Sequence, residues 1–70
     1  MIKAGIIGGA GYTGGEVIRL LLNHPDAELS FVQSESQAGR FVYQTHTDCY
    51  GETDLKFTKD WDINVDVIFL

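Results

Sequence analysis

The chain opens with an apolar run that is followed by a helical pattern. Residues Ile2 to Ile7 are mostly apolar, which is typical of a strand buried in a parallel sheet. From Thr13 to Asn23 the apolar residues have the spacing of an amphipathic helix, and they are Val17, Ile18, Leu20, Leu21 and Leu22. Pro25 ends this helix because its ring cannot continue it. The pattern therefore predicts a strand, a turn and a helix.

Two details of the predicted helix concern its start and its buried face. Thr13 and Glu16 have the spacing of a capping box, in which each side chain accepts a backbone N–H of the first turn. We therefore interpret Glu16 as a structural cap. One helical stripe, made of Gly14, Val17, Leu20 and Leu21, is predicted to face the sheet.

The rest of the chain predicts further strands. Residues Ala27 to Gln33 alternate well enough for a second strand, and a right-handed crossover places it parallel to the first. The later segments are an irregular stretch from Phe41 to Thr53, a short strand from Leu55 to Thr58, a polar connection from Lys59 to Asn64 with Trp61 on the sheet edge, and a buried central strand from Val65 to Leu70. This order predicts an α/β fold, a Rossmann-like parallel sheet with helices.

Glycines fill the turn between the first strand and the helix. Gly9, Gly11 and Gly14 match the G-x-G-x-x-G pattern, and Gly8, Gly11 and Gly14 match a looser G-x-x-G-x-x-G pattern. Strand, glycine turn and helix together form the context of a dinucleotide-binding site. Gly8 or Gly9 allows the sharp turn, Gly11 lets a pyrophosphate approach the backbone, and Gly14 allows close packing of the helix on the strand. We expect the phosphates to lie at the positive end of the helix.

Length and composition place this chain at the front of a larger protein. Seventy residues with one convincing helix form a small core for a parallel sheet. We therefore expect residues 1–70 to be the N-terminal portion of a dinucleotide-binding domain, the first part of a doubly wound fold, with the catalytic domain outside this chain.

Net charge is −5 and the five Lys and Arg residues are scattered, which argues against a nucleic-acid partner. Without a signal peptide or membrane span, we expect no membrane partner and a cytoplasmic location.

The segment after the second strand is where cofactor choice is predicted. In dinucleotide-binding folds an acidic residue there accepts the ribose 2′-OH of NAD, whereas hydroxyl groups and a cation hold the 2′-phosphate of NADP. Ser34, Ser36 and Arg40 favour NADP, and Glu35 favours NAD unless its side chain turns to solvent. A solvated loop with a turn at Ala38 and Gly39 is the alternative interpretation.

The irregular stretch offers no site for metal or nucleophilic chemistry. His46, Asp48 and Cys49 match no metal-ligand spacing, so we predict no metal site. Asp48 would raise the pKa of the neighbouring thiol. Cys49 is therefore interpreted as a half-buried structural thiol.

The run from Ile7 to Pro25 resembles the amino terminus of the N-acetyl-γ-glutamyl-phosphate reductase family, in the semialdehyde dehydrogenase superfamily. Its Gly-Tyr-Thr-Gly, Glu16 and His-Pro residues are more specific than the glycines alone. Ala38-Gly39-Arg40 is similar to the family's A-G-K/R segment, His46 to the histidine of its H-P-x-L segment, and Val65 to Leu70 to its D-V-V-F-L-A strand. Thr47 stands where the family has proline, and Glu35 where arginine is common.

The resemblance implies an NADPH-dependent reductase that converts N-acetyl-glutamyl 5-phosphate to N-acetyl-glutamate 5-semialdehyde and phosphate in arginine biosynthesis. The family's catalytic cysteine and histidine would lie beyond Leu70, so this chain would carry no catalytic residue. The cofactor-binding candidates are Gly8, Gly11, Tyr12, Thr13 and Gly14 on the phosphate side and Ser34, Ser36, Gly39 and Arg40 on the adenosine side. The substrate would be a small acyl phosphate with an acetyl or another acyl group, and the full-length protein a homo-oligomer.

Two alternatives remain open. NAD-dependent nucleotide-sugar epimerases of the extended short-chain dehydrogenase family resemble the run from Gly8 to Tyr12, but they usually continue differently and carry an Asp after the second strand. A non-catalytic NADP-sensing protein is the other alternative. A reductase needs a cysteine and a histidine beyond Leu70, whereas a sensor does not.

Overall fold

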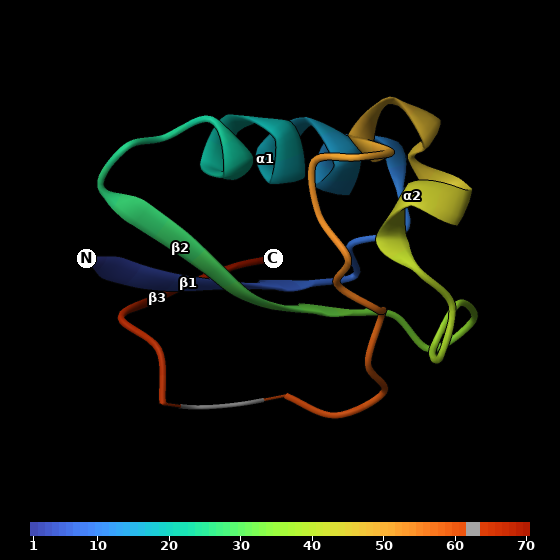
Figure 1. Ribbon diagram of the computed structural model, residues 1–70. Helices are drawn as coiled ribbons and strands as arrows, with labels where there is room; N and C mark the ends of the chain where they lie inside the picture. Colours follow the sequence, from blue (N-terminus) through green and yellow to red (C-terminus); the bar gives the residue numbers. More distant parts are fainter. Residues whose placement is uncertain (62–63) are drawn as a thin grey trace.

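The computed structural model describes residues 1–61 and 64–70. They form a three-stranded parallel sheet with one long helix on one face (Figure 1). The elements in chain order are β1 (Ile2–Ile7), α1 (Tyr12–Leu22), β2 (Ala27–Gln33), α2 (Val42–Thr45), a 3₁₀ turn η1 (Thr47–Cys49) and β3 (Val67–Phe69). The predicted α/β class is confirmed.

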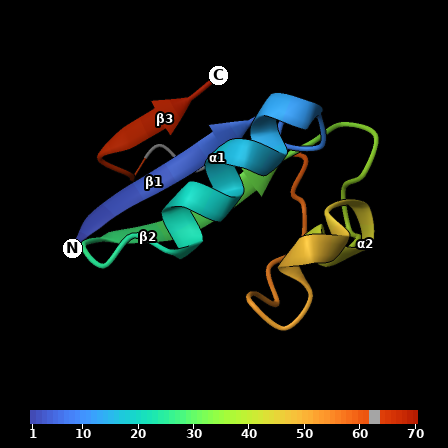
Figure 2. The same ribbon diagram turned by 90° about the horizontal axis from the view of Figure 1, so that it is seen from above.

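The sheet has the strand order β2-β1-β3, so the chain returns to the opposite side of β1 after β2 (Figure 2). β1 pairs in parallel with both neighbours, and Ile7 lies beside Gln33 at the end of the β1–β2 ladder. At the start of β3, Asp66 exchanges two hydrogen bonds with the backbone of Lys3: its N–H donates to the Lys3 oxygen and its carboxylate accepts the Lys3 N–H, each at 2.8 Å. These bonds fix where β3 joins the sheet.

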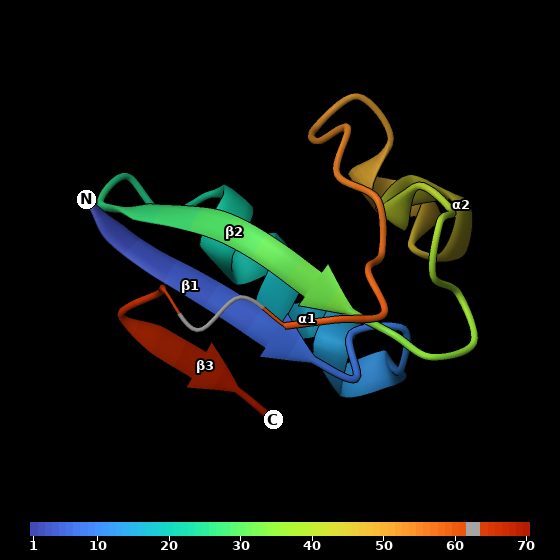
Figure 3. The same cartoon turned by 90° about the horizontal axis from the view of Figure 1, so that it is seen from below.

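The core lies between α1, the sheet and the segment from Val42 to Phe57. Its buried side chains are Ile6, Ile18, Val32, Val42, Cys49 and Phe57. On the other face of the sheet the ring of Phe31 covers Gly5, where a Cβ would lie 2.0 Å from the ring. Among the described residues, no helix covers this second face (Figure 3).

The structure corrects two predictions about α1. Its N-cap is Gly11, in extended conformation and without a side-chain cap bond, so Thr13 and Glu16 form no capping box. Glu16 instead pairs with Arg19. Leu20 does not face the sheet: it is 70% exposed, and Ile18 takes the buried position.

Three later predictions also change. The stretch from Phe41 to Thr53 contains α2 and η1 and is not irregular throughout. The predicted strand from Leu55 to Thr58 forms only isolated bridges, at Lys56 and Thr58. The buried central strand predicted from Val65 to Leu70 is shorter, Val67–Phe69, and within the described residues it lies at the edge of the sheet with Val67 and Phe69 partly exposed. The predicted connection from Lys59 to Asn64 lies partly outside the described residues.

Candidate dinucleotide-binding site

The glycine turn leaves β1 at Gly8 and enters α1 after Gly11. Gly8 has φ +75°, a left-handed conformation that glycine adopts without strain. This confirms the predicted sharp turn. Gly14 packs against the turn itself, because a Cβ there would lie 2.7 Å from the Cα and the oxygen of Gly9. The start of α1 is therefore pressed directly against the turn.

A cavity of about 190 Å³ opens where the turn meets the carboxyl ends of β1 and β3. Its lining includes all five residues predicted for the phosphate side, which are Gly8, Gly11, Tyr12, Thr13 and Gly14. Phe69 and Leu70 close it from the β3 side. Because β2 and β3 flank β1 on opposite sides, this is the switch point of the sheet, where open α/β folds bind their ligands.

The start of α1 offers unpaired donors to this cavity. The first hydrogen bond of the helix runs from the N–H of Gly15 to the oxygen of Gly11, at 3.1 Å. Within the described part of the chain, the N–H groups of Tyr12, Thr13 and Gly14 find no acceptor, as is usual for a first turn. A Cβ at Gly11 would meet nothing closer than the Gly8 oxygen at 3.9 Å. The free N–H donors, the positive end of the helix and the open space at Gly11 together fit the binding of a pyrophosphate group.

The adenosine-side candidates follow the carboxyl end of β2, and none of them lines the cavity. The Ser34 hydroxyl is buried and accepts the N–H of Gln37 at 3.2 Å. Arg40 donates to the side chain of Gln37 at 3.4 Å, and Ser36 and Glu35 are exposed. Gly39 has φ +90° and is exposed together with Ala38, which agrees with the alternative interpretation of a solvated loop with a turn at these residues. The structure thus brings the phosphate-side residues together and leaves the others in a neighbouring loop.

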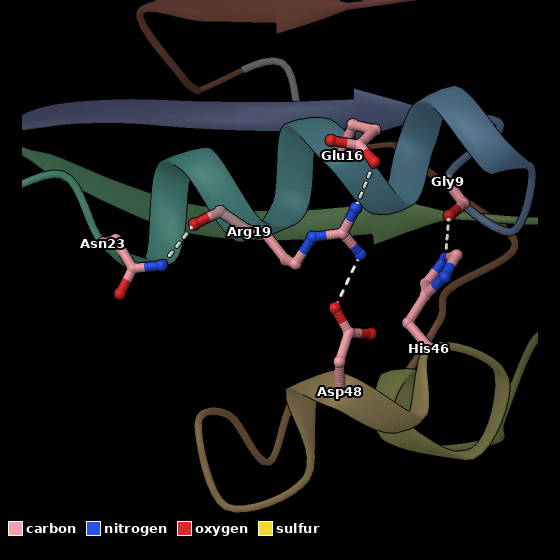
Figure 4. A network of polar contacts seen from close by, with 6 residues as sticks. All are labelled: Gly9, Glu16, Arg19, Asn23, His46 and Asp48. Carbon is pink, nitrogen blue, oxygen red and sulfur yellow. Dashed lines mark hydrogen bonds and ion pairs between the residues drawn. The ribbon is translucent and has the colours of Figure 1, made fainter.

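Two residues that the glycine pattern did not reveal hold the turn. The side chain of Gln33, at the end of β2, accepts the N–H of Gly8 at 3.1 Å. From the other side, Nε2 of His46 lies 2.7 Å from the oxygen of Gly9 (Figure 4). A polar side chain at the end of an apolar strand was the only sequence signal for Gln33. His46 had been considered and rejected as a metal ligand, and was otherwise noted only for its resemblance to the family's histidine.

Side chains of the segment from Phe41 to Thr53 make contacts that support a structural role for this segment. Arg19 joins α1 to η1 through an ion pair with Asp48 at 2.6 Å, and this hydrogen bond raises the pKa of Arg19 (Figure 4). Within the described residues no group of His, Cys, Asp and Glu could hold a metal ion. In the same part of the chain, every helix is too short or too polar to cross a bilayer.

Cys49 is 1% exposed, more fully buried than predicted. Burial, followed by the charge of Asp48, raises its pKa, so little thiolate forms near neutral pH. We expect this thiol to react with iodoacetamide at pH 8 at least tenfold more slowly in the folded protein than in urea, since only the thiolate attacks. Mass spectrometry of timed samples measures both rates, and similar rates would contradict a buried structural role.

Comparison with known families decides where this architecture belongs. A family model described as the NAD-binding domain of semialdehyde dehydrogenase matches residues 3–70. The chain belongs to the semialdehyde dehydrogenase family. The resemblance found in the sequence is thereby confirmed, and the matched part of this family is its nucleotide-binding domain.

The chain is also similar in sequence to individual proteins of known name. N-acetyl-gamma-glutamyl-phosphate reductase of Parabacteroides distasonis is 60% identical over 70 residues, which are 99% of this chain and 22% of that protein. The enzyme of the same name from Bacteroides thetaiotaomicron is 59% identical, with the same coverage. A putative [LysW]-L-2-aminoadipate/[LysW]-L-glutamate phosphate reductase of Pyrococcus furiosus is 46% identical, over all of this chain and 21% of that protein. The chain spans about a fifth of the length of these relatives.

Proposed function

We propose that this chain is the NADPH-binding part of an N-acetyl-γ-glutamyl-phosphate reductase. The observation that carries the proposal is the cavity at the switch point of the sheet, where the glycine turn and the start of α1 meet. The 60% identity to a reductase of that name supports the choice of reaction. The family match over residues 3–70 favours this proposal over the epimerase.

Within the reaction this segment binds and orients the cofactor. Bound NADPH would supply the hydride that reduces the acyl group, and catalytic groups outside residues 1–70 would act on the acyl phosphate. The backbone N–H groups of Tyr12, Thr13 and Gly14 would hold the pyrophosphate, with the Thr13 hydroxyl exposed beside them. Orienting the cofactor in this way reduces the entropy lost on reaching the reactive geometry.

We further propose NADP as the preferred cofactor. Arg40 lies on the exposed loop after β2, together with Ser36, and both could contact a 2′-phosphate. Glu35 is exposed, so its carboxylate is free to turn to solvent and away from that phosphate. The exposure of Glu35 is compatible with the proposal, which requires its side chain to turn to solvent. Ser34 remains a candidate, although its hydroxyl already accepts a bond from Gln37.

A second substrate follows from the Pyrococcus furiosus relative. That relative is named for a LysW-linked substrate, so a segment similar to this chain also occurs in a protein named for a substrate other than the N-acetyl compound. The higher identity to the N-acetyl enzymes, 60% against 46%, favours the acetylated substrate. That the full-length protein is a homo-oligomer and lies in the cytoplasm stays a prediction.

The test is the reverse reaction of the complete protein that contains this chain. N-acetylglutamate 5-semialdehyde, NADP⁺ and phosphate should give N-acetyl-glutamyl 5-phosphate, NADPH and a proton. We expect the absorbance of NADPH to rise only when phosphate is present, and NADH to form more slowly when NAD⁺ replaces NADP⁺. Cofactor binding without turnover would instead support the NADP-sensing protein, and turnover without phosphate would contradict an acyl-phosphate product.

A further inference from the structure

The glycine turn is held from the β2 side by Gln33. This side chain is only 6% exposed, and both of its polar atoms are used. Its Oε1 accepts the N–H of Gly8 at 3.1 Å, and its Nε2 donates to the oxygen of Lys59 at 3.3 Å. The backbone oxygen of Gln33 also accepts the N–H of Gly9, at 2.8 Å. One residue therefore fixes two successive N–H groups of the turn.

His46 holds the same turn from the opposite side, at the end of α2. Its Nε2 lies 2.7 Å from the Gly9 oxygen, and since a carbonyl only accepts, Nε2 carries the proton and donates it (Figure 4). The ring lies so close to α1 that a Cβ on Gly15 would be 2.8 Å from Cε1 and Nδ1. It also stands edge-on to Phe57, with ring centroids 6.2 Å apart. The imidazole therefore has little freedom to leave Gly9.

Holding Gly9 determines where the first turn of α1 lies. With its N–H and its oxygen both bonded, the peptide groups on either side of Gly9 cannot rotate freely. Gly14 packs directly on the Gly9 backbone, so a shift of Gly9 displaces the helix start. The donors at the cavity, the N–H groups of Tyr12, Thr13 and Gly14, move with it.

We propose that Gln33 and His46 are positioning residues that orient the phosphate-binding turn without touching the cofactor. Neither residue lines the cavity. Packing alone would need only an apolar side chain of similar size at either position. The hydrogen bonds of Gln33 and His46 in addition orient the peptide groups of Gly8 and Gly9. The proposal deepens the cofactor site described above and rests on it.

The test uses matched variants of the complete protein. Gln33→Met keeps length but removes the acceptor for Gly8, and His46→Leu removes the donor to Gly9. His46→Gln restores an N–H donor near the position of Nε2. As a control, Asp48→Asn weakens the Arg19 ion pair in the same segment and touches neither Gly8 nor Gly9.

We expect Gln33→Met and His46→Leu each to raise the dissociation constant and the KM for NADPH about fivefold, the loss typical of one intramolecular hydrogen bond. The kcat at saturating NADPH and the KM for the acyl phosphate should stay at the values of the unchanged protein. His46→Gln should recover most of the affinity, and Asp48→Asn should bind NADPH normally. An unchanged affinity in His46→Leu, or the same loss in His46→Gln and Asp48→Asn, would overturn the positioning role.

Amide hydrogen exchange separates this inference from the proposed function. If the unchanged protein does not bind NADPH, the cofactor proposal fails, but the exchange rates of the Gly8 and Gly9 amides, which both donate to Gln33, still report on the turn. We expect His46→Leu and Gln33→Met to accelerate exchange at these residues and to leave β1 unchanged. Equal exchange in variant and unchanged protein would overturn the positioning role whatever the cofactor result.

Discussion

Replacing Gly11 with valine is expected to raise the dissociation constant for NADPH tenfold or more, while the thermal midpoint falls by only a few degrees. Gly11 has φ −77° and ψ 174°, an extended conformation that valine adopts without strain. A Cβ there meets only the Gly8 oxygen at 3.9 Å, which is ordinary contact. The folded chain therefore accepts the side chain, at a cost of roughly 0.5–1 kcal/mol for a poorer helix N-cap.

The loss of affinity arises because the new side chain points into the cavity. Gly11 lines the cavity beside Gly8 and Thr13, where the phosphate must approach the backbone. A tenfold change in the dissociation constant corresponds to about 1.4 kcal/mol of binding free energy. This is less than the free energy of the several contacts that a displaced pyrophosphate would lose. Fluorescence titration of NADPH gives the affinity, and a melting curve gives the stability.

Gly11→Ala serves as the graded control for this prediction. It adds one methyl group at the same position, so we expect an affinity between those of glycine and valine. If valine leaves NADPH binding unchanged, the pyrophosphate does not lie at Gly11 and the site assignment fails. If valine instead unfolds the protein, the conclusion that there is room for a side chain at Gly11 is wrong.

Local periodicity was sufficient to predict β1, β2 and the long helix α1, but not the strand expected from Leu55 to Thr58. β1 and β2 have the predicted bounds, because an apolar run and an alternating run each specify a strand without help from distant residues. The parallel pairing of these strands and the return to β1 after β2 agree with an α/β fold. The carboxyl ends of the strands then lie at one edge, which is where the predicted glycines line a cavity.

The side of α1 that faces the sheet was harder to predict. Apolar residues fill most positions from Val17 to Leu22, so several stripes of the helix are equally apolar. The close contact of Gly14 with Gly9 sets the rotation of the helix, and this contact places Ile18 inward and Leu20 outward. The same turn makes Gly11 the N-cap, which leaves Thr13 inside the helix and unable to form the predicted capping box.

The residues that hold the glycine turn depend on contacts that no local pattern contains. Gln33 is 25 positions from Gly8, and His46 is 37 positions from Gly9. Helix α2, which carries the chain to His46, has four residues, too few to show a helical period. Fingerprint residues are thus visible in the sequence because their role is local, whereas their supports appear only when the sheet brings distant segments together.

Gly14→Ala is expected to give the opposite result to Gly11→Val: a large loss of stability. Alanine in a helix is ordinarily favoured over glycine by about 0.5–1 kcal/mol. Here its Cβ would lie 2.7 Å from Cα and the oxygen of Gly9 and 2.8 Å from the carbonyl carbon, all of them backbone atoms. The turn cannot move away cheaply, because Gln33 and His46 bond to it on both sides. We expect a net loss of about 2 kcal/mol in the free energy of unfolding, typical of overpacking.

Urea unfolding of the complete protein measures this loss, and Gly15→Ala is the matched control. The neighbouring glycine occupies the same helix turn, but a Cβ there approaches only the ring of His46, at 2.8 Å. The imidazole can rotate about its side-chain bonds at the cost of its hydrogen bond to Gly9, whereas the Gly9 backbone can shift only with the whole turn, so Gly15→Ala should cost less stability than Gly14→Ala. Equal stability of Gly14→Ala and the unchanged protein would mean that the helix start is free to move from Gly9. In that case neither Gln33 nor His46 could orient the helix start through this contact.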